Sequence, residues 1–282
     1  MQTETNTNIF KKIGWLPILI AAAVILAVIL LLTLRRGGDQ PEAEAAGSSE
    51  LIEASATPEP TDVVYTLESY AASHGYTRAD YPEALLELYD MNPDARQVVM
   101  EYPARKDDNP SMDLTADDYT PGEIPLLMQW DVRWGYRQYN ESFFARTGCC
   151  PTAMSMAVIG LTGDTSVTPW VCAEFSTENG YCIPGSGTIW DFVPAAAEHF
   201  GLHCQELGLD EGLITSELEA GNVVMIEVGP GDFTEHGHYL LITGRENGMF
   251  RVNDPFSRRN SEQLWTYERI APQIEGMWTL SA

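Results

Sequence analysis

A cysteine pair followed by a proline is the segment of this sequence best suited to covalent chemistry. Residues 148–153 read GCCPTA, and proline suits the first turn of a helix. Apolar residues then recur at helical spacing, so we expect a helix over 152–161. The partial positive charge at a helix start stabilises a thiolate at Cys149, the form of cysteine that attacks a carbonyl carbon. In the alternative interpretation, Cys149 and Cys150 are simply small buried hydrophobic residues.

A histidine and an aspartate are spaced to assist such a nucleophile. His238 opens an apolar strand, and Asp254 ends a second strand that follows an Asn-Gly turn at 247–248. The two are equally distant from residue 246, so an antiparallel hairpin makes them near neighbours on one face. A carboxylate beside an imidazole fixes its tautomer and stabilises its cation. Two alternatives remain: a structural role for His238, or a metal pair of His236 and His238, for which no third ligand stands nearby.

A helix and a sheet must bring these residues together. The pattern predicts helices over 152–161 and 190–200, and strands over 223–228, 239–243 and 250–253. A helical first half and a stranded second half indicate an α+β domain. Ahead of it, Pro82 and an Asn-Pro cap at 92–93 predict a helical hairpin, which we expect to be a structural extension that packs on the domain.

The N-terminal region predicts a membrane anchor. Residues 15–34 form an uncharged apolar stretch which, at about 1.5 Å per residue, spans a hydrocarbon core. Lys and Arg pairs flank it at 11–12 and 35–36, and the sequence after it is a poor cleavage site. We therefore expect a single-pass protein of the cell membrane with its C-terminal part outside the cytoplasm; a cleaved signal peptide is the alternative.

The charge is strongly acidic and unevenly spread. The chain of 282 residues carries a formal net charge of −25, although its first 36 residues carry +3. The balance excludes a nucleic-acid partner, because binding a phosphate backbone needs clustered cations. Residues 39–60 hold six acids and no Lys or Arg, so this segment is expected to be an extended, disordered linker.

The motifs together resemble those of a known enzyme family. The GCCPTA segment at 148–153 is similar to the G-C-G-P-T-A motif of bacterial cysteine peptidase domains related to the double-glycine leader peptidases, in the papain-like superfamily. The similarity extends over residues 121–280. Four further matches occur in the same chain order: Gln129-Trp130-Asp131, Gly185-Ser186-Gly187-Thr188-x-Trp190, Gly237-His238-Tyr239 and Asp254-Pro255.

The resemblance implies a papain-like fold with a Cys-His-Asp triad and no metal or cofactor. Cys149 is then the nucleophile, His238 the general base and acid, and Asp254 the residue that orients the imidazole. Gln129 is implied as the oxyanion donor, at a larger distance from the cysteine than is usual in papain-like enzymes. Cys150 stands where the family has Gly, so we expect its side chain to crowd the substrate or to compete as a nucleophile.

The remaining cysteines permit a cross-link. Cys172 and Cys182 flank a polar loop, and outside the cell they are the pair most suited to a disulfide. Cys204 is expected to be buried and free. In the alternative, all five cysteines are reduced.

The sequence thus predicts a membrane-anchored cysteine peptidase that acts on a peptide or protein substrate. Two alternatives keep the fold: an acyltransferase at the cell surface, or an inactive surface-binding module. The expected organisation is a cytoplasmic N-terminus (1–14), a transmembrane helix (15–34), an acidic linker (35–60), a helical extension (61–120) and a peptidase domain (121–282).

Overall fold

The computed structural model describes residues 66–184 and 187–282. The expected anchor at 15–34 and the whole acidic linker at 35–60 lie outside these ranges. Within them, no helix has the length and apolar character that crossing a bilayer requires. The described residues belong to one compact unit.

Three helices form the extension that the sequence predicts as a hairpin. They are α2 (Leu67–His74), α3 (Glu83–Met91) and α4 (Arg96–Arg105), with short 3₁₀ turns at Arg78–Asp80 and Pro93–Ala95. The hairpin of α3 and α4 is confirmed, and α2 is an addition. Asn92 accepts the backbone N–H of Asp94, so it caps the turn as expected. The apolar faces of these helices meet side chains of the following domain, including Trp130 and Phe143, in one hydrophobic cluster.

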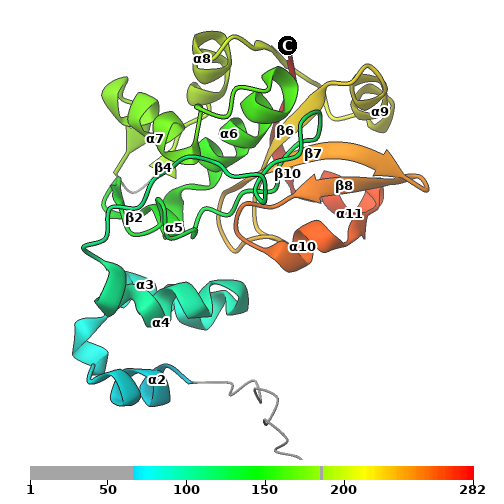
Figure 1. Cartoon of the computed structure of the whole chain (residues 1–282). Helices are drawn as coiled ribbons and strands as arrows, with labels where there is room; N and C mark the ends of the chain where they lie inside the picture. Colours follow the sequence, from blue (N-terminus) through cyan, green and yellow to red (C-terminus); the bar gives the residue numbers. More distant parts are fainter. Residues whose placement is uncertain (1–65, 185–186) are drawn as a thin grey trace, which may run out of the picture. The chain divides into compact units, whose positions relative to one another are not determined.

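The helical half of the domain is built around one almost completely buried helix. This helix, α6 (Cys149–Thr162), starts three residues earlier than predicted, so Pro151 occupies its first turn. Around it lie α5 (Phe144–Thr147), α7 (Pro169–Glu178) and α8 (Phe192–His199), of which α5 and α7 were not predicted (Figure 1). The sequence does carry a start signal for α7, because Thr168 caps its N-terminus and Pro169 occupies its first position. Two small hairpins, Gln138–Tyr139 with Ser142–Phe143 and Cys182–Ile183 with Gly187–Thr188, complete this half.

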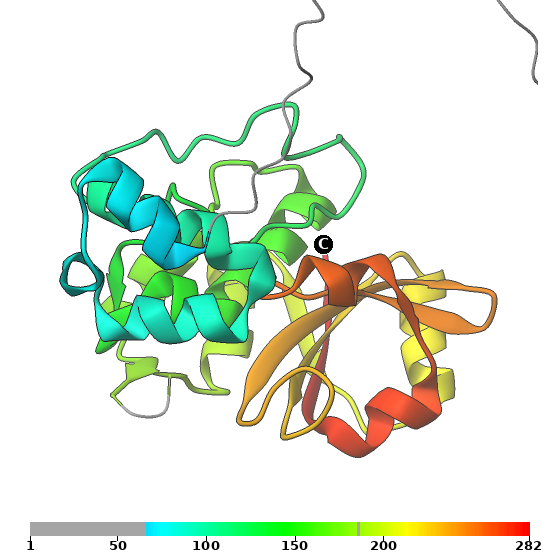
Figure 2. The ribbon, with the colours of Figure 1, turned by 90° about the horizontal axis from the view of Figure 1, so that it is seen from below.

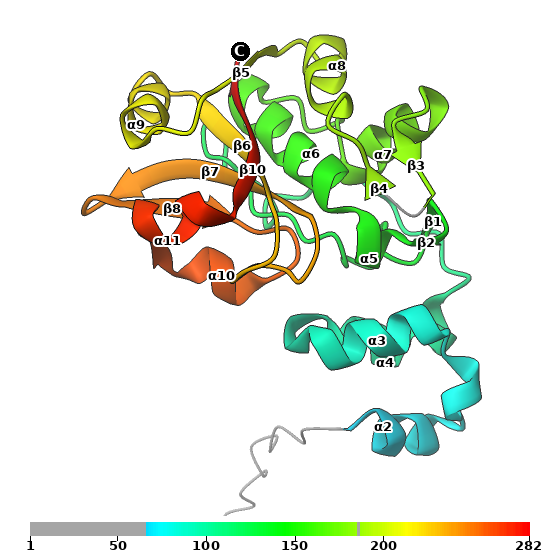
Figure 3. The ribbon, with the colours of Figure 1, turned by 180° about the vertical axis from the view of Figure 1, so that it is seen from behind.

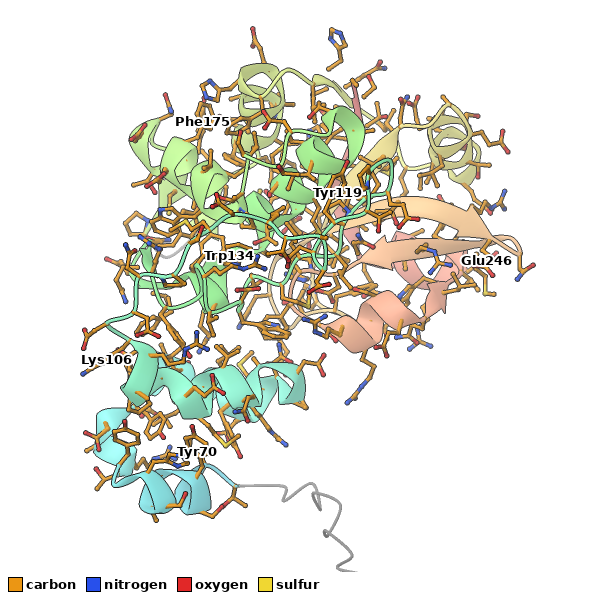
Figure 4. The ribbon with its side chains drawn as sticks, in the orientation of Figure 1. Tyr70, Lys106, Tyr119, Trp134, Phe175 and Glu246 are labelled. Atoms are coloured by element: carbon orange, nitrogen blue, oxygen red, sulfur yellow. The ribbon has the colours of Figure 1, made fainter. Side chains whose placement is uncertain are left out.

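The second half is a six-stranded antiparallel sheet in the order β5-β10-β6-β7-β8-β9. Its strands are β5 (His203–Glu206), β6 (Val223–Val228), β7 (His238–Glu246), β8 (Met249–Asn253), β9 (Leu264–Trp265) and β10 (Ile274–Ser281). The three predicted strands correspond to β6, β7 and β8, so the α+β prediction is confirmed for the described residues. The β7–β8 turn has left-handed Asn247 and Gly248, as an Asn-Gly turn requires, and its tip at Glu246 projects outward (Figure 4).

The sheet separates two hydrophobic cores. Alternate residues of β6 face opposite sides: Val223 and Met225 pack with α6 to α8, whereas Val224 and Ile226 pack beneath the helices on the other face. Those helices are α9 (Glu211–Glu219) and α11 (Tyr267–Ile270), while α10 (Arg258–Glu262) contacts β8. Figure 3 shows α6 and α9 on opposite sides of the central strands. Figure 2 shows the extension beside the helical half.

The expected disulfide is not formed. All five cysteines are free in the described structure. Cys172 is fully buried on α7 within the core beneath α6, whereas Cys182 packs against a separate cluster that contains Trp134 and Tyr139. The prediction of a bond between them is wrong because their side chains pack in different clusters. Cys204 is free as predicted, although half-buried rather than buried.

Candidate active site

Cys149 is the first residue of α6, as the sequence predicts for a nucleophile. It is half-buried and lines a cleft of about 700 Å³. The first turn below it is fastened by Thr152, whose backbone N–H and hydroxyl both donate to the carbonyl of Gly148, at 3.1 and 2.7 Å. The sulfur therefore sits at a rigid helix N-terminus, where the helix dipole favours negative charge.

Gly148 has to be glycine because it packs against an immobile ring. A Cβ built at Gly148 lies 2.6 Å from ring atoms of Phe144, which is fully buried. We expect Gly148→Ala to shift the start of α6, to destabilise the fold by about 1–3 kcal/mol and to lower peptidase kcat/KM at least about tenfold. Chemical denaturation and kinetics check both values. Gly208→Ala is the matched control, because its added Cβ meets nothing within 4 Å; equal effects of the two variants would contradict the argument.

His238 and Asp254 form the predicted pair. The imidazole Nε2 donates to Oδ1 of Asp254 over 2.8 Å, and both side chains are buried. Because Nε2 is engaged, Nδ1 is the ring nitrogen left for Cys149, whose proximity favours the charged form of the ring. Burial lowers the pKa of His238, but the Asp254 carboxylate outweighs it and, together with Cys149, raises that pKa to about 10. The raised pKa favours the cationic form of the ring at neutral pH.

The predicted register of the hairpin is slightly wrong. In the first pairs of the ladder Leu241 lies opposite Asn253 and Ile242 opposite Val252, so Asp254 is opposite Leu240 and diagonal to His238. The turn at Asn247-Gly248 pairs Glu246 with Met249, so the hairpin is centred after residue 246, and a bulge between Ile242 and Gly244 shifts the register by one residue. The two side chains still share one face and meet, because diagonal neighbours are within reach of long side chains.

Asp254 is held by the segment that follows it. Its Oδ1 also accepts the backbone N–H groups of Phe256 and Ser257, at 2.8 and 3.2 Å. Its Oδ2 accepts the side-chain amide of Asn260 at 2.7 Å, and its own backbone N–H donates to Ser261. These contacts fix the carboxylate that orients His238. The sequence analysis did not assign a role to Asn260 or Ser261.

The helical extension supports this same segment. The amide of Asn92 donates to the carbonyl of Phe256 at 2.6 Å, and the indole N–H of Trp130 donates to the same oxygen at 2.8 Å. The backbone N–H of Arg258 donates to the carboxylate of Asp94 at 2.9 Å. The extension is thus hydrogen-bonded to the loop that positions Asp254.

Loss of the Asn92 contact is expected to weaken that support. Asn92 is 97% buried, so Asn92→Ala leaves the Phe256 carbonyl with one donor fewer and should destabilise the fold by about 1–3 kcal/mol. Urea denaturation of the full chain measures the loss. Asn109→Ala, which removes only an exposed contact to Arg137, should stay within about 0.5 kcal/mol of wild type. A loss no larger than this control would show that the contact contributes little.

Gln129 lies between the two halves of the site. Its backbone N–H donates to the carbonyl of Pro255 at 2.8 Å, and its side-chain N–H donates to the carbonyl of Ala145 at 2.9 Å. The side chain is buried, and Oε1 has no hydrogen-bond partner among the described residues. Gln129 therefore bridges the residue after Asp254 and the segment leading to Cys149, with one amide hydrogen left for a further acceptor.

Cys150 does not enter the cleft. It is fully buried in the core beneath α6, in the hydrophobic cluster that also contains Tyr239. Burial, with the neighbouring Cys149, raises the pKa of the Cys150 thiol well above its usual value. The expectation that Cys150 crowds the substrate or competes as a nucleophile is wrong, because its side chain points into the protein.

The cleft contains one buried carboxylate that the sequence analysis did not single out. Glu227 lines the cleft with Cys149, and its side chain is buried. Its signal in the sequence is a single carboxylate in the otherwise apolar strand VVMIEV. His236 also lines the cleft but is exposed, unlike the buried His238, so the two histidines have different surroundings.

Comparison with known proteins now adds to this geometry. A family model described as "Peptidase_C39 like family" matches residues 122–281. The chain belongs to this family. The match covers Cys149, His238, Asp254 and Gln129, and it leaves the helical extension outside. The membership supports cysteine peptidase activity for the domain. Among curated protein sequences, none matches the chain.

Solved structures of the same kind are similar to the chain at low identity. The peptidase domain of Streptococcus ComA, a bifunctional ABC transporter of a quorum-sensing pathway, is 16% identical; the match covers 48% of this chain and 91% of that one, with a TM-score of 0.39. A putative C39-like peptidase from Bacillus anthracis is 13% identical over 57% of this chain and 96% of its own, with a TM-score of 0.33. A double-glycine-motif protease from an AMS/PCAT transporter, solved in complex with the leader peptide, is 12% identical. The match covers 57% of this chain and 91% of that one, with a TM-score of 0.33.

Proposed function

We propose that this protein is a membrane-anchored, extracytoplasmic cysteine peptidase that hydrolyses a peptide or amide bond through an acyl-enzyme. The observation that carries the proposal is the grouping of Cys149, which lines a cleft, with a buried His238 that is hydrogen-bonded to Asp254. The anchor is the uncharged stretch 15–34, and the acidic linker separates it from the domain.

In the proposed reaction the Cys149 thiolate attacks the carbonyl carbon of the scissile bond. The bond between sulfur and carbon forms as the carbonyl electrons move to oxygen, and the backbone N–H of Cys149 and the free amide hydrogen of Gln129 stabilise the oxyanion. The imidazolium of His238 then protonates the leaving amine, which breaks the C–N bond. Water, deprotonated by His238, attacks the thioester and releases the acid.

Asp254 keeps the ring oriented through both steps. Its hydrogen bond to Nε2 directs Nδ1 at the sulfur and stabilises the cation that exists before the leaving amine is protonated. No metal or cofactor takes part in this sequence of steps.

Product analysis in H₂¹⁸O tests the proposal. The full chain in detergent is incubated with a mixed peptide library, with and without an added amine acceptor, and the products are identified by mass spectrometry. Hydrolysis places ¹⁸O in new C-terminal carboxylates. Acceptor-linked products that form instead would show an acyltransferase. Stable binding with no product would show an inactive binding module.

A further inference from the structure

A buried carboxylate in the cleft is not used by the proposed reaction. Glu227, on β6, is only 7% exposed, yet it is one of the residues that line the cleft beside Cys149. It is the sole charged residue of its strand. Burying an ionisable group costs free energy, so a carboxylate at this position calls for a partner.

The direction of the Glu227 side chain follows from the strand. Val223 and Met225 pack in the core beneath α6, and alternation places Glu227 on that same face of the sheet. Glu227 pairs across the ladder with Tyr239, another residue of the cleft wall. Its Oε1 lies against the backbone of Gly237, where an added Cβ would come within 2.8 Å. The carboxylate thus sits between the end of β6 and the loop that leads to His238.

Within residues 66–184 and 187–282, no Lys, Arg or His side chain forms an ion pair with Glu227. Among the residues that the structure describes, none donates a hydrogen bond to its buried Oε2. Burial and the nearby carboxylate of Glu275 raise the pKa of Glu227 to about 7, against the opposing effect of His238. His238 is hydrogen-bonded to the carboxylate of Asp254, so Asp254 and not Glu227 is the partner of the imidazolium charge.

The rest of the cleft wall suits a positively charged group. Trp190 is 47% exposed and lines the cleft together with Tyr239, and both rings contact Trp278. Aromatic faces attract ammonium and guanidinium groups. Arg146, the cation of the lining, is bound by Glu87 and by the carbonyl of Ala84 on the extension, so it is not available to neutralise Glu227.

We propose that Glu227 determines specificity by binding an ammonium or guanidinium group of the substrate close to the scissile bond. This inference rests on the proposed peptidase function. The substrate class is then a peptide with a lysine, an arginine or a free amino group within about two residues of the cleaved carbonyl. The cation approaches from the cleft and supplies the partner that the buried carboxylate lacks, while Trp190 and Tyr239 flank its apolar stem.

Paired peptides test the proposal. For a cleavable sequence from the library, kcat/KM is compared between lysine and its uncharged analogue norleucine at each position, and between free and acetylated N-termini. We expect wild type to prefer one charged form by about 10- to 100-fold. Glu227→Gln should reduce that ratio to within about threefold of one. The position or terminus that responds distinguishes a side chain from an N-terminal amine as the source of the cation.

Two outcomes would overturn the proposal. One is a preference for the charged form that is the same in wild type and Glu227→Gln. The other is an equal loss of kcat/KM for charged and neutral peptides with a shifted pH profile, which would make Glu227 a positioning residue for His238. Glu275→Gln is the matched control, because it removes the neighbouring, exposed carboxylate; it should keep or increase the ratio, since the pKa of Glu227 falls without Glu275. A melting curve verifies that each variant is folded.

Binding separates this inference from the proposed function. Cys149→Ala is titrated with the same lysine and norleucine peptides and the affinity is measured by fluorescence anisotropy. If the wild type cleaves nothing but Cys149→Ala still prefers the charged peptide, the peptidase proposal fails and Glu227 recognition stands. If peptides are cleaved without any preference for charge, recognition by Glu227 fails and the peptidase proposal stands.

Discussion

Replacing Cys149 with alanine is expected to abolish peptide hydrolysis, with a loss in kcat of at least about 10³-fold. The reason is that no other sulfur in the described structure can take over its position. Cys150 is fully buried, and Cys204 lies on strand β5 and not on helix α6. Neither residue lines the cleft. The kinetics of a cleavable library peptide, measured with the full chain in detergent, give the loss.

Cys150→Ala is the natural control for this experiment. It removes the adjacent sulfur without touching the cleft, so kcat should fall less than about threefold while stability falls by roughly 1 kcal/mol through lost packing. If Cys150→Ala were the inactive variant and Cys149→Ala retained activity, the assignment of the nucleophile would have to be reversed.

Asp254→Asn should produce the second large effect, a loss of roughly 10²- to 10⁴-fold in kcat/KM. Asparagine keeps the shape of the side chain, and Asn260 can rotate its amide to accept from the new N–H group. What disappears is the negative charge that raises the pKa of His238 against the effect of burial. We therefore expect the pKa of His238 to fall far below 10, which NMR titration of the ring can follow.

Stability should change with pH in a characteristic direction. Since the pKa of His238 is raised from 6.5 to about 10 on folding, protonated His238 stabilises the folded state fully below pH 6.5, and this contribution is lost as the pH rises toward 10. The loss in unfolding free energy of Asp254→Asn relative to wild type should therefore be largest at or below neutral pH. This loss should become smaller as the pH rises toward 10. Urea unfolding at several pH values measures it; a difference that widens with pH would contradict the assigned charge state.

Local signals in the sequence were sufficient for the core of the site. The helix after Cys149, the Asn-Gly turn and the placement of Asp254 beside His238 each depend on residues close together in the chain. Such features follow from helical periodicity, turn chemistry and strand alternation. The bulge after Ile242 was not predicted, because no residue type there requires it.

Other features depend on long-range packing and were missed for that reason. Strand β10 lies between β5 and β6 although it comes last in the chain, and α7 contains both polar and apolar residues around its axis. The direction of the Cys150 side chain depends on the hydrophobic cluster in which it packs. The separation of Cys172 from Cys182 likewise follows from their packing in different clusters. Spacing along the chain carries none of this information.

Selective alkylation tests the central claim, that His238 activates Cys149, without knowledge of the substrate. The full chain is treated with iodoacetamide at neutral pH, and the rate at each cysteine is followed by peptide mass spectrometry. Burial raises the pKa of the half-buried Cys204 to about 11, which makes it an internal reference. We predict that Cys149 reacts at least about 100-fold faster than Cys204, and that His238→Gln removes most of this advantage. Reaction of Cys149 no faster than Cys204, or an unchanged rate in His238→Gln, would contradict the account.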